Sequence, residues 1–267
     1  MRSMNLPDAA QAEILWQTIR RETEHAVRNE PILASFLHLS VLRHKNFARM
    51  LAFHLSTKMS SAVMDARALF EIYLEALEQD SAIIHAALAD IVAYYERDPA
   101  CDTYSLPLLY YKGFHAIQTH RINHWLWQQN RHTLAYFLQN RASEVLGVDI
   151  HPAASMGYGI MIDHGTGVVI GETAVLGNNI SLLHGVTLGG SGKESGDRHP
   201  KISDGVMIGA NASVLGNIRV HTCAKVGAGS VVVNDVPEYS TVVGVPARVI
   251  SKTDNHESPA QEMDQRI

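Results

Sequence analysis

Two histidines in the second half of the chain stand beside charged residues and are the first candidates for chemistry. His164 follows Asp163 in the segment Asp-His-Gly-Thr-Gly, and His199 follows Asp197-Arg198 at the end of a glycine-rich segment. An imidazole titrates near neutral pH, so it is suited to accept and return a proton. Titratable groups gathered where a regular scaffold is interrupted are typical of a functional site. The scaffold that would position them has to be identified next.

Nucleotide binding is a weaker interpretation of the glycine-rich segments. A P-loop would need glycine in place of Thr187 and Ser or Thr in place of Glu194. The pair Gly157 and Gly159 lacks the third glycine of a dinucleotide fingerprint, because Ile162 stands there. Neither nucleotide fingerprint is present.

A metal site is also a weaker interpretation. His115, His120 and His124 lie close together in a predicted helix, but no His-Glu-x-x-His pattern accompanies them. We expect surface or interhelical histidines here, and no metal.

The distribution of glycine divides the chain into two parts. Of 19 glycines, only Gly113 and Gly147 lie in the first 148 residues. Glycine costs about 1 kcal/mol relative to alanine inside a helix, whereas turns with positive φ favour it. We therefore predict an all-α domain over residues 1–148, a turn-rich domain over residues 149–250 and a flexible polar tail over residues 251–267.

Apolar residues of the first part recur at three-and-four spacing, which predicts amphipathic helices. Two stripes show it: Leu69, Ile72, Tyr73, Ala76 and Leu77, and Ile84, Leu88, Ile91 and Tyr95. Ser81 is the predicted N-cap of the second helix, which should end before Pro99 because a residue preceding proline avoids helical geometry. A loop should then run to Pro107. Further helices are expected over residues 15–28, 32–42, 108–129 and 133–146.

The second part repeats every six residues. Steps of six from Ile150 to Val186, and again from Ile202 to Val232, meet thirteen apolar residues without a polar exception. If about half of all residues are apolar, chance gives such a run with a probability on the order of one in ten thousand. The repeat therefore describes the structure of this part.

A period of six fits a parallel β-helix rather than an α-helix or an alternating strand. Each hexapeptide makes a short strand and a corner, and three make a triangular turn of about 18 residues whose equivalent positions stack about 4.8 Å apart. Val186 and Ile202 are separated by 16 residues instead of six. Ten extra residues should therefore form a loop, predicted within residues 189–201, and a loop that interrupts a regular scaffold is a functional candidate.

Composition excludes several classes of function. The chain is 46% hydrophobic and 18% charged, with a net charge of −5 and a pI near 6.3, which argues against disorder, a nucleic-acid surface and a polybasic membrane patch. No run approaches the roughly 18 apolar residues of a membrane helix, and the start does not resemble a signal peptide. With only Cys101 and Cys223, we expect reduced thiols and a cytoplasmic protein.

Seven segments together match a known family. They are Asp149-Ile-His-Pro-Ala-Ala, Asp163-His-Gly-Thr-Gly, Gly171-Glu-Thr-Ala, Val186-Thr-Leu-Gly-Gly, Gly196-Asp-Arg-His-Pro-Lys, Gly244-Val-Pro-Ala-Arg and, in the helical part, Arg97-Asp-Pro-Ala. On these segments the chain resembles hexapeptide-repeat acyltransferases and, over nearly its full length, bacterial serine O-acetyltransferases. The resemblance implies an α + β fold in which the all-α domain precedes a left-handed parallel β-helix. It also implies acetyl transfer from acetyl-CoA to the hydroxyl of L-serine, the first step from serine to cysteine.

The resemblance also implies the roles of individual residues. His164 matches the base that takes the proton of the serine hydroxyl, a contribution of about 10² to 10⁴ in rate. Asp149 matches the carboxylate that orients the imidazole. The residues that match serine contacts are Asp98 and Asp163 for the ammonium group, Arg198 for the carboxylate, and His199 as a further contact.

Acetyl-CoA is implied as a co-substrate, with no tightly bound cofactor, in a groove between neighbouring β-helices. The matching positions are Gly190, Ser191, Ala210, Lys225 and Ala228. The backbone amide of Gly190 is the candidate donor to the developing oxyanion. The resemblance further implies a homotrimer, paired into a dimer of trimers, L-cysteine as a feedback inhibitor, and binding of O-acetylserine sulfhydrylase through Ile267.

Three alternatives remain open. A hexapeptide acetyltransferase for a sugar or antibiotic hydroxyl could use His184 as its base. A zinc-dependent carbonic anhydrase is disfavoured, because no two histidines of the predicted β-helix are five residues apart. A non-catalytic scaffold that only docks the sulfhydrylase would not need His164.

Overall fold

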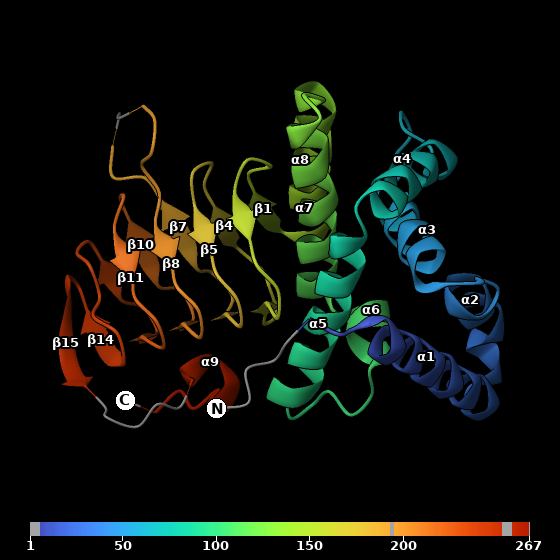
Figure 1. The fold of residues 1–267 in the computed structure, drawn as a ribbon, viewed down its shortest axis with the longest axis horizontal. Coiled ribbons are helices and arrows are strands. Elements are labelled where there is room, and N and C mark those ends of the chain that lie inside the picture. Colours follow the sequence, from blue (N-terminus) through green and yellow to red (C-terminus); the bar gives the residue numbers. More distant parts are fainter. Residues whose placement is uncertain (1–5, 193–194, 253–257, 267) are drawn as a thin grey trace.

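A computed structural model describes residues 6–192, 195–252 and 258–266 of the chain. Helices form one end of the molecule and a parallel β-helix forms the other, with α5, α7 and α8 between the β-helix and α1 to α4 (Figure 1). The predicted α + β architecture is confirmed. Within the described ranges, no helix is long and apolar enough to cross a membrane.

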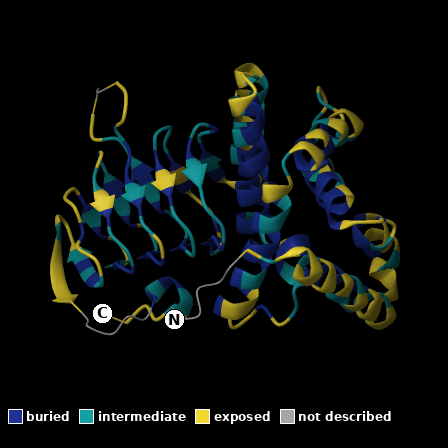
Figure 2. Cartoon of the chain, in the orientation of Figure 1, coloured by how far each residue is buried: buried dark blue, intermediate teal, exposed yellow. Residues whose placement is uncertain are grey.

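Helices joined by short connections make up the chain from Ala9 as far as Leu146. Its elements are α1 (Ala9–Asn29), a 3₁₀ turn (Pro31–Leu33), α2 (Ala34–Leu37), a π-helical turn (His38–Leu42), α3 (Phe47–Met59), α4 (Ala66–Gln79), α5 (Ser81–Arg97), α6 (Ser105–Tyr110), α7 (Lys112–Gln128) and α8 (His132–Leu146). The central helix α7 is buried along most of its length (Figure 2).

Several details of the predicted helices are wrong. The cap of α5 is Asp80, whose carboxylate accepts from the amide of Ala82 at 3.0 Å, and Ser81 is the first helical residue instead. The helix expected over residues 108–129 is divided at Tyr111, and the loop expected to reach Pro107 ends at Ser105. The sequence also gave no signal for α3, because its buried residues lie on most of its faces rather than on one stripe.

The second part consists of three parallel sheets. Its strands are β1 (Val148–Ile150), β2 (Ser155–Met156), β3 (Met161–Ile162), β4 (Val168–Ile170), β5 (Val175–Leu176), β6 (Ser181–Leu182), β7 (Thr187–Gly189), β8 (Lys201–Ile202), β9 (Met207–Ile208), β10 (Ser213–Leu215), β11 (Arg219–Val220), β12 (Lys225–Val226), β13 (Val231–Val232), β14 (Ser240–Gly244) and β15 (Ala247–Lys252). Sheet A is β1-β4-β7-β10-β13, sheet B is β2-β5-β8-β11, and sheet C is β3-β6-β9-β12-β14 with β15 added antiparallel. The predicted parallel β-helix is confirmed.

The six-residue repeat marks the interior of the β-helix. Twelve of the thirteen positions are buried, and Met156 is half-buried. The stacked positions change phase once, however, because Ile150 pairs with Ile170 and Ile162 with Leu182. Eight residues therefore separate Ile162 from Ile170, where a regular side has six.

This phase change corrects the predicted length of the long loop. The stacked residue before the loop is Leu188 rather than Val186, and Ile202 follows it after 14 residues. The loop thus holds eight extra residues instead of ten. The other two lie in the corner between β3 and β4, which is the corner that contains His164.

One helix fastens the helical part to the first turn of the β-helix. The Asp90 carboxylate of α5 accepts from the amide of Ile160 at 2.8 Å and from the buried guanidinium of Arg121 at 2.8 Å. About two turns further along α5, Arg97 donates to the carbonyl of Gly159 at 3.0 Å. These polar residues are buried because their partners are otherwise unpaired backbone groups of the coil.

The C-terminal segment is not free where it is described. A short helix, α9 (Pro259–Glu262), places Ala260 at 0% exposure against Leu183 and Met207. The Ser181 hydroxyl donates to the carbonyl of Ala260 at 2.8 Å. The expectation that no core forms in the tail is therefore wrong for this segment, and Ile267, the predicted anchor for the sulfhydrylase, lies outside the described residues.

Candidate active site

His164 projects from the corner that has two extra residues. Its backbone takes the left-handed conformation, with φ of 57°, which Asn179 and Asn211 adopt at other corners of the coil. A non-glycine residue in this conformation is uncommon, and such residues concentrate at functional sites. The His164 side chain is 76% exposed, so the imidazole is accessible.

A cavity of about 510 Å³ opens beside this imidazole. It is lined by the end of α5, the start of α7 and the His164 corner, and it contains Asp98, Asp163 and His164. Three residues that were singled out from distant segments of the sequence are thus brought together. Two carboxylates beside an imidazole suit a ligand that carries a cationic group next to a group from which a proton is removed.

The cavity has further members that the sequence did not reveal. Tyr111 and Lys112 line it, and burial, followed by the charge of Asp98, raises the pKa of Tyr111 above its usual range. Lys112 donates to the hydroxyl of Thr166 and so contacts the His164 corner. Asp98 ends α5 and accepts from the amide of Ala100 at 2.9 Å. Spacing alone gives no signal for these contacts, because they join separate elements.

Arg198 and His199 lie elsewhere. They precede β8, at the corner between sheets A and B, whereas His164 lies at the corner between sheets C and A. The Arg198 guanidinium donates to Glu172 at 2.6 Å, and this hydrogen bond lowers the pKa of the Glu172 carboxyl. A single chain therefore does not bring the predicted carboxylate binder to the predicted base.

The tautomer of His199 follows from its neighbours. The amide of Thr173 donates to Nδ1 at 3.2 Å, and the Thr173 hydroxyl, which already accepts from two amides, lies 2.9 Å from the same nitrogen. Nδ1 is thus an acceptor, and the proton of the neutral ring sits on Nε2. Burial, reinforced by the charge of Arg198, lowers the pKa of His199. The ring occupies space that a Cβ on Gly171 would fill, at 2.0 Å from it.

Asp149 belongs with the second group in a single chain. It points outward from β1 and accepts from Gln139 Nε2 at 2.7 Å. Burial lowers the pKa of His151, and the negative charges of Glu172 and Asp149 oppose this shift, whereas the charge of Arg198 adds to it. Among the hydrogen bonds of the described residues, none joins Asp149 to His164. Among the ion pairs of the described ranges, His164 takes part in one, with Asp163 at 3.8 Å between Nε2 and Oδ1.

The predicted coenzyme contacts divide between the same two corners. Ala210 and Ala228 follow strands of sheet C, as His164 and His184 do, and the rings of the two histidines are 6.0 Å apart. Gly190 and Ser191 follow β7 at the other corner, where Gly190 lies against Arg198. Lys225 donates to the backbone carbonyl of Arg266 in the C-terminal segment.

The outward face of sheet A separates these two corners. Its outward positions are Asp149, Val169, Thr187, Ser213 and Val231, which are in register with one another. No lysine or arginine occurs among them, whereas the outward row of sheet B includes Lys201 and Arg219. Apart from Asp149 at one end, the outward row of sheet A is uncharged, so a contact over Val169, Thr187, Ser213 and Val231 would desolvate no charge on these side chains.

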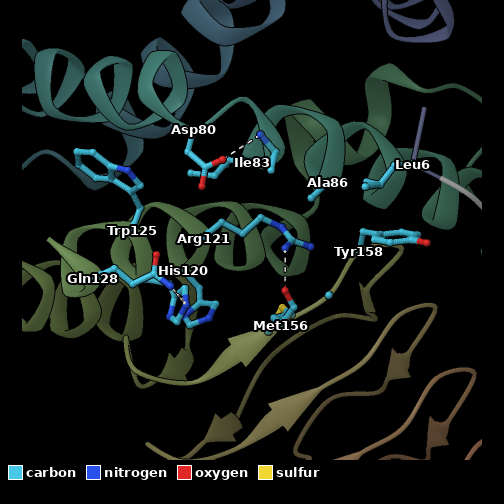
Figure 3. A pocket seen from close by; sticks show the side chains of 13 residues that line it. Leu6, Asp80, Ile83, Ala86, His120, Arg121, Trp125, Gln128, Met156 and Tyr158 are labelled. Atoms are coloured by element: carbon cyan, nitrogen blue, oxygen red, sulfur yellow. Dashed lines mark hydrogen bonds between the residues drawn. The ribbon is translucent and has the colours of Figure 1, made fainter. Parts of the chain in front are cut away.

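The histidines of α7 fall into two places: His115 packs between helices, whereas His120 and His124 line one cavity beside the β-helix. His115 lies 3.2 Å from His54 between their Nε2 atoms, and His124 Nδ1 lies 2.8 Å from the carbonyl of Pro152. Figure 3 shows His120 and Arg121 among the side chains that line this separate cavity, whose volume is about 230 Å³. Among the residues of the described ranges, no three His, Cys, Asp or Glu side chains form a group that could hold a metal.

A helical part before a triangular parallel β-helix, with an exposed histidine at a corner, defines a hexapeptide-repeat acyltransferase. The family model described as "Serine acetyltransferase, N-terminal" matches residues 15–119. The serine acetyltransferase of Haemophilus influenzae is 55% identical over 251 residues, which cover 94% of each chain. The chain belongs to the serine acetyltransferase family.

Solved structures of the family include complexes with three small molecules. The Neisseria gonorrhoeae enzyme in complex with serine is 69% identical, with a TM-score of 0.86, over 88% of this chain and 96% of that one. A complex with cysteine is 53% identical, with a TM-score of 0.94, over 96% and 99%. The Brucella abortus enzyme in complex with coenzyme A is 49% identical, with a TM-score of 0.88, over 90% and 96%.

Proposed function

We propose that the chain transfers the acetyl group of acetyl-CoA to the hydroxyl of L-serine, with His164 as the general base. The observation that carries this proposal is the cavity that joins His164 to Asp98 and Asp163. The two carboxylates hold the serine ammonium group, and this places the serine hydroxyl beside the imidazole. The relatives that share this fold are serine acetyltransferases, and one was solved with serine bound.

The reaction proceeds through a tetrahedral intermediate. His164 removes the hydroxyl proton while the serine oxygen attacks the thioester carbonyl, and the negative charge moves to the former carbonyl oxygen. The backbone amide of Gly190 donates to that oxyanion, a contribution of a few kcal/mol. Collapse of the intermediate breaks the carbon–sulfur bond, and the departing thiolate takes the proton back from the imidazolium. Acetylserine and coenzyme A leave, and the histidine is neutral again.

The complete site requires two copies of the chain. Arg198, His199 and Asp149 lie at one edge of sheet A, and His164 lies at the other. Packing three β-helices with sheet A toward a threefold axis places the His164 corner of one copy beside the Arg198 corner of the next. Arg198 then binds the serine carboxylate, and His199 donates its Nε2–H to the serine as a further contact. Asp149 orients the imidazole of the neighbouring His164.

Coenzyme A runs along the same seam. The corner beyond His164 continues through His184, Ala210 and Ala228, where small side chains leave the backbone accessible. Gly190 and Ser191 face it from the neighbouring copy, and Lys225, three residues before Ala228, supplies a cation for the phosphates. A family member solved with coenzyme A supports acetyl-CoA as the co-substrate.

Two trimers join through the helical parts. The segment from Pro31 to Leu42 leaves Ile32 89% exposed, with Leu33, Phe36 and Leu39 also exposed. An exposed apolar group of this kind is typical of an interface, and a second copy is its proposed occupant. A hexamer follows from one such contact per chain of the trimer.

We further propose that L-cysteine inhibits the enzyme, that the sulfhydrylase binds to it and that it is located in the cytoplasm. Cysteine carries the same ammonium and carboxylate groups as serine, so it competes for Asp98, Asp163 and Arg198, and a family member was solved with cysteine bound. O-acetylserine sulfhydrylase binds through Ile267. Cys101 and Cys223 are both free thiols, which supports a reducing compartment.

A substrate comparison tests the proposed function. Acetyl transfer from acetyl-CoA is measured by release of the coenzyme A thiol, with L-serine and with a panel of sugar and aminoglycoside hydroxyl acceptors. Serine should be the preferred acceptor by at least a hundredfold in kcat/KM. Transfer to a galactoside without transfer to serine would establish the alternative in which His184 is the base, and absence of any transfer would favour the scaffold.

A further inference from the structure

One part of the helical domain has an unusual distribution of charge. From residue 31 to residue 64 the sequence contains no aspartate and no glutamate, although the whole chain has 27 acidic residues and a net charge of −5. The same segment contains Arg43, Lys45, Arg49 and Lys58, and Arg67 follows at the start of α4. Positive charge is therefore concentrated in a protein that is acidic overall.

Four of these cations line one hollow between α3 and α4, which we name the α3–α4 groove. Its volume is about 610 Å³, and Arg43, Lys45, Arg49 and Arg67 all line it without any carboxylate. All four residues are exposed. In the part of the chain that the structure describes, no ion pair involves any of them. Among the described residues, therefore, no carboxylate in ion-pair contact offsets their mutual repulsion.

Two aromatic rings hold the guanidinium groups in place. Arg43 lies over the ring of Phe53 at 5.0 Å, and Arg49 lies over the ring of Phe70 at 5.3 Å. Contacts of this kind restrict the arginine side chains while leaving their N–H groups free to bind an anion. The groove is thus partly organised before any ligand binds.

A buried histidine adjoins the same cations. His44 Nε2 lies 2.9 Å from the carbonyl of Leu39, so this nitrogen carries the proton. Burial lowers the pKa of His44, and the charges of Arg43 and Arg49 lower it further. The ring is neutral at pH 7, and the positive charge of the groove therefore comes from Arg and Lys side chains.

We propose that the α3–α4 groove binds a small polyphosphate anion, either the phosphate chain of a nucleoside triphosphate or inorganic tripolyphosphate. Planar guanidinium groups bind phosphate oxygens in pairs, and lysine adds a point charge. A hollow of about 610 Å³ matches the 300–1,000 Å³ of small-molecule sites and favours such a ligand over an extended macromolecule. Bound phosphates would remove the repulsion among the four cations.

Calorimetric titration of the full-length protein tests this proposal. The two probes are sodium tripolyphosphate and ATP, titrated without acetyl-CoA because its own phosphates could compete. We expect one molecule bound per chain, with an affinity that falls as the salt concentration rises. ATP binding at least tenfold more tightly than tripolyphosphate would identify the nucleotide as the source, and equal affinities would identify the inorganic chain.

Two double variants with the same change in charge distinguish the groove from general attraction. Arg43→Gln with Arg49→Gln should weaken binding at least tenfold. The control, Arg21→Gln with Arg28→Gln on exposed positions of α1, should change it less than twofold. No binding of either probe would overturn the proposal, and so would equal weakening in both variants. A change of oligomeric state in the groove variant, with unchanged anion affinity, would instead assign these cations to a contact between copies.

Discussion

The hydroxyl of Tyr94 makes two hydrogen bonds to the backbone of Ile162. It donates to the carbonyl oxygen at 2.8 Å and accepts from the amide at 3.0 Å. Gly113, at the start of α7, lies so close that a Cβ there would meet the Ile162 carbonyl oxygen at 1.9 Å. Ile162 directly precedes Asp163, and Asp98 follows Tyr94 by one turn of α5. This contact therefore sets the distance between the two carboxylates of the cavity.

Tyr94→Phe should destabilise the protein and weaken serine binding. Removal of the hydroxyl leaves a buried N–H and a buried C=O without this partner, which costs about 1–3 kcal/mol in the free energy of unfolding. Urea unfolding measures that loss, and steady-state kinetics should show a raised KM for serine. Tyr95→Phe is the matched control, because Tyr95 is exposed on the same helix and should change stability by less than about 0.5 kcal/mol. Equal effects of both variants would argue against a positioning role for Tyr94.

His164→Gln should lower kcat for serine acetylation by about 10² to 10⁴, because the amide of glutamine cannot accept the hydroxyl proton as the imidazole does. His184→Gln is the control, since His184 occupies the same corner one turn along the coil. At saturating acetyl-CoA it should keep kcat within about threefold of the unaltered protein, because His184 lies on the path proposed for the coenzyme and not at the position proposed for the base. The reverse pattern would transfer the role of base to His184.

Asp98→Asn should raise the KM for serine at least tenfold, because a neutral amide cannot balance the ammonium charge. The variant is compared with the unaltered protein on serine and on 3-hydroxypropionate, which lacks the ammonium group. Discrimination between these acceptors should shrink in the variant. Unchanged discrimination would mean that Asp98 does not contact this group.

Two inactive variants should complement each other if the site lies between copies. His164→Ala keeps Arg198, and Arg198→Ala keeps His164, so mixed trimers contain some sites that are intact. If the two variants assemble at random in equal amounts, about one quarter of the sites combine an intact His164 with an intact Arg198. The experiment compares the serine acetylation rate after co-expression with that of each variant alone. Activity no greater than the average of the two variants would place both residues in one chain's site.

Acid should unfold the protein through its buried histidines. Burial lowers the pKa of His54 to about 3, with a further contribution from Lys58, and burial also lowers that of His120 to about 3. Between pH 6.5 and about 3 the unfolded chain binds protons that the folded chain excludes. The free energy of unfolding should therefore fall as the pH falls, by about 1.4 kcal/mol per pH unit for each histidine, and stay level above pH 6.5.

Urea midpoints from pH 5 to pH 8 measure this dependence. His120→Gln should reduce its slope by about one proton relative to the unaltered protein. A slope unaffected by His120→Gln would show that other groups cause the acid sensitivity.

The sequence predicted the β-helix well because its signal is periodic. Inward positions at every sixth residue have to be apolar, and burial of Ile150, Val168 and Val214 follows directly. The same periodicity concealed the phase change after Ile162, because buried apolar residues two positions apart occur there, such as Val168 with Ile170 and Val186 with Leu188. The positions of apolar residues alone do not show which residue of such a pair stacks on its equivalent in the next turn of the coil.

The site was predicted less completely. Asp98, Asp163 and His164 line one cavity, but polar residues at helical spacing on α5 gave no sign of being buried. Asp90 and Arg97 are charged, and a charged residue is expected to face water unless a partner is known. Their partners are backbone groups of another element, so the docking of α5 emerges only from the fold.

The eight additional residues between Leu188 and Ile202 have a consequence for the family's adaptability. Each coil of a solenoid touches only its immediate neighbours, so an insertion at one vertex leaves the stacking above and below it intact. Arg198 and His199 lie at the end of this insertion. Changes in its length or composition can therefore alter acceptor preference while the folding energetics of the remaining rungs stay as they are.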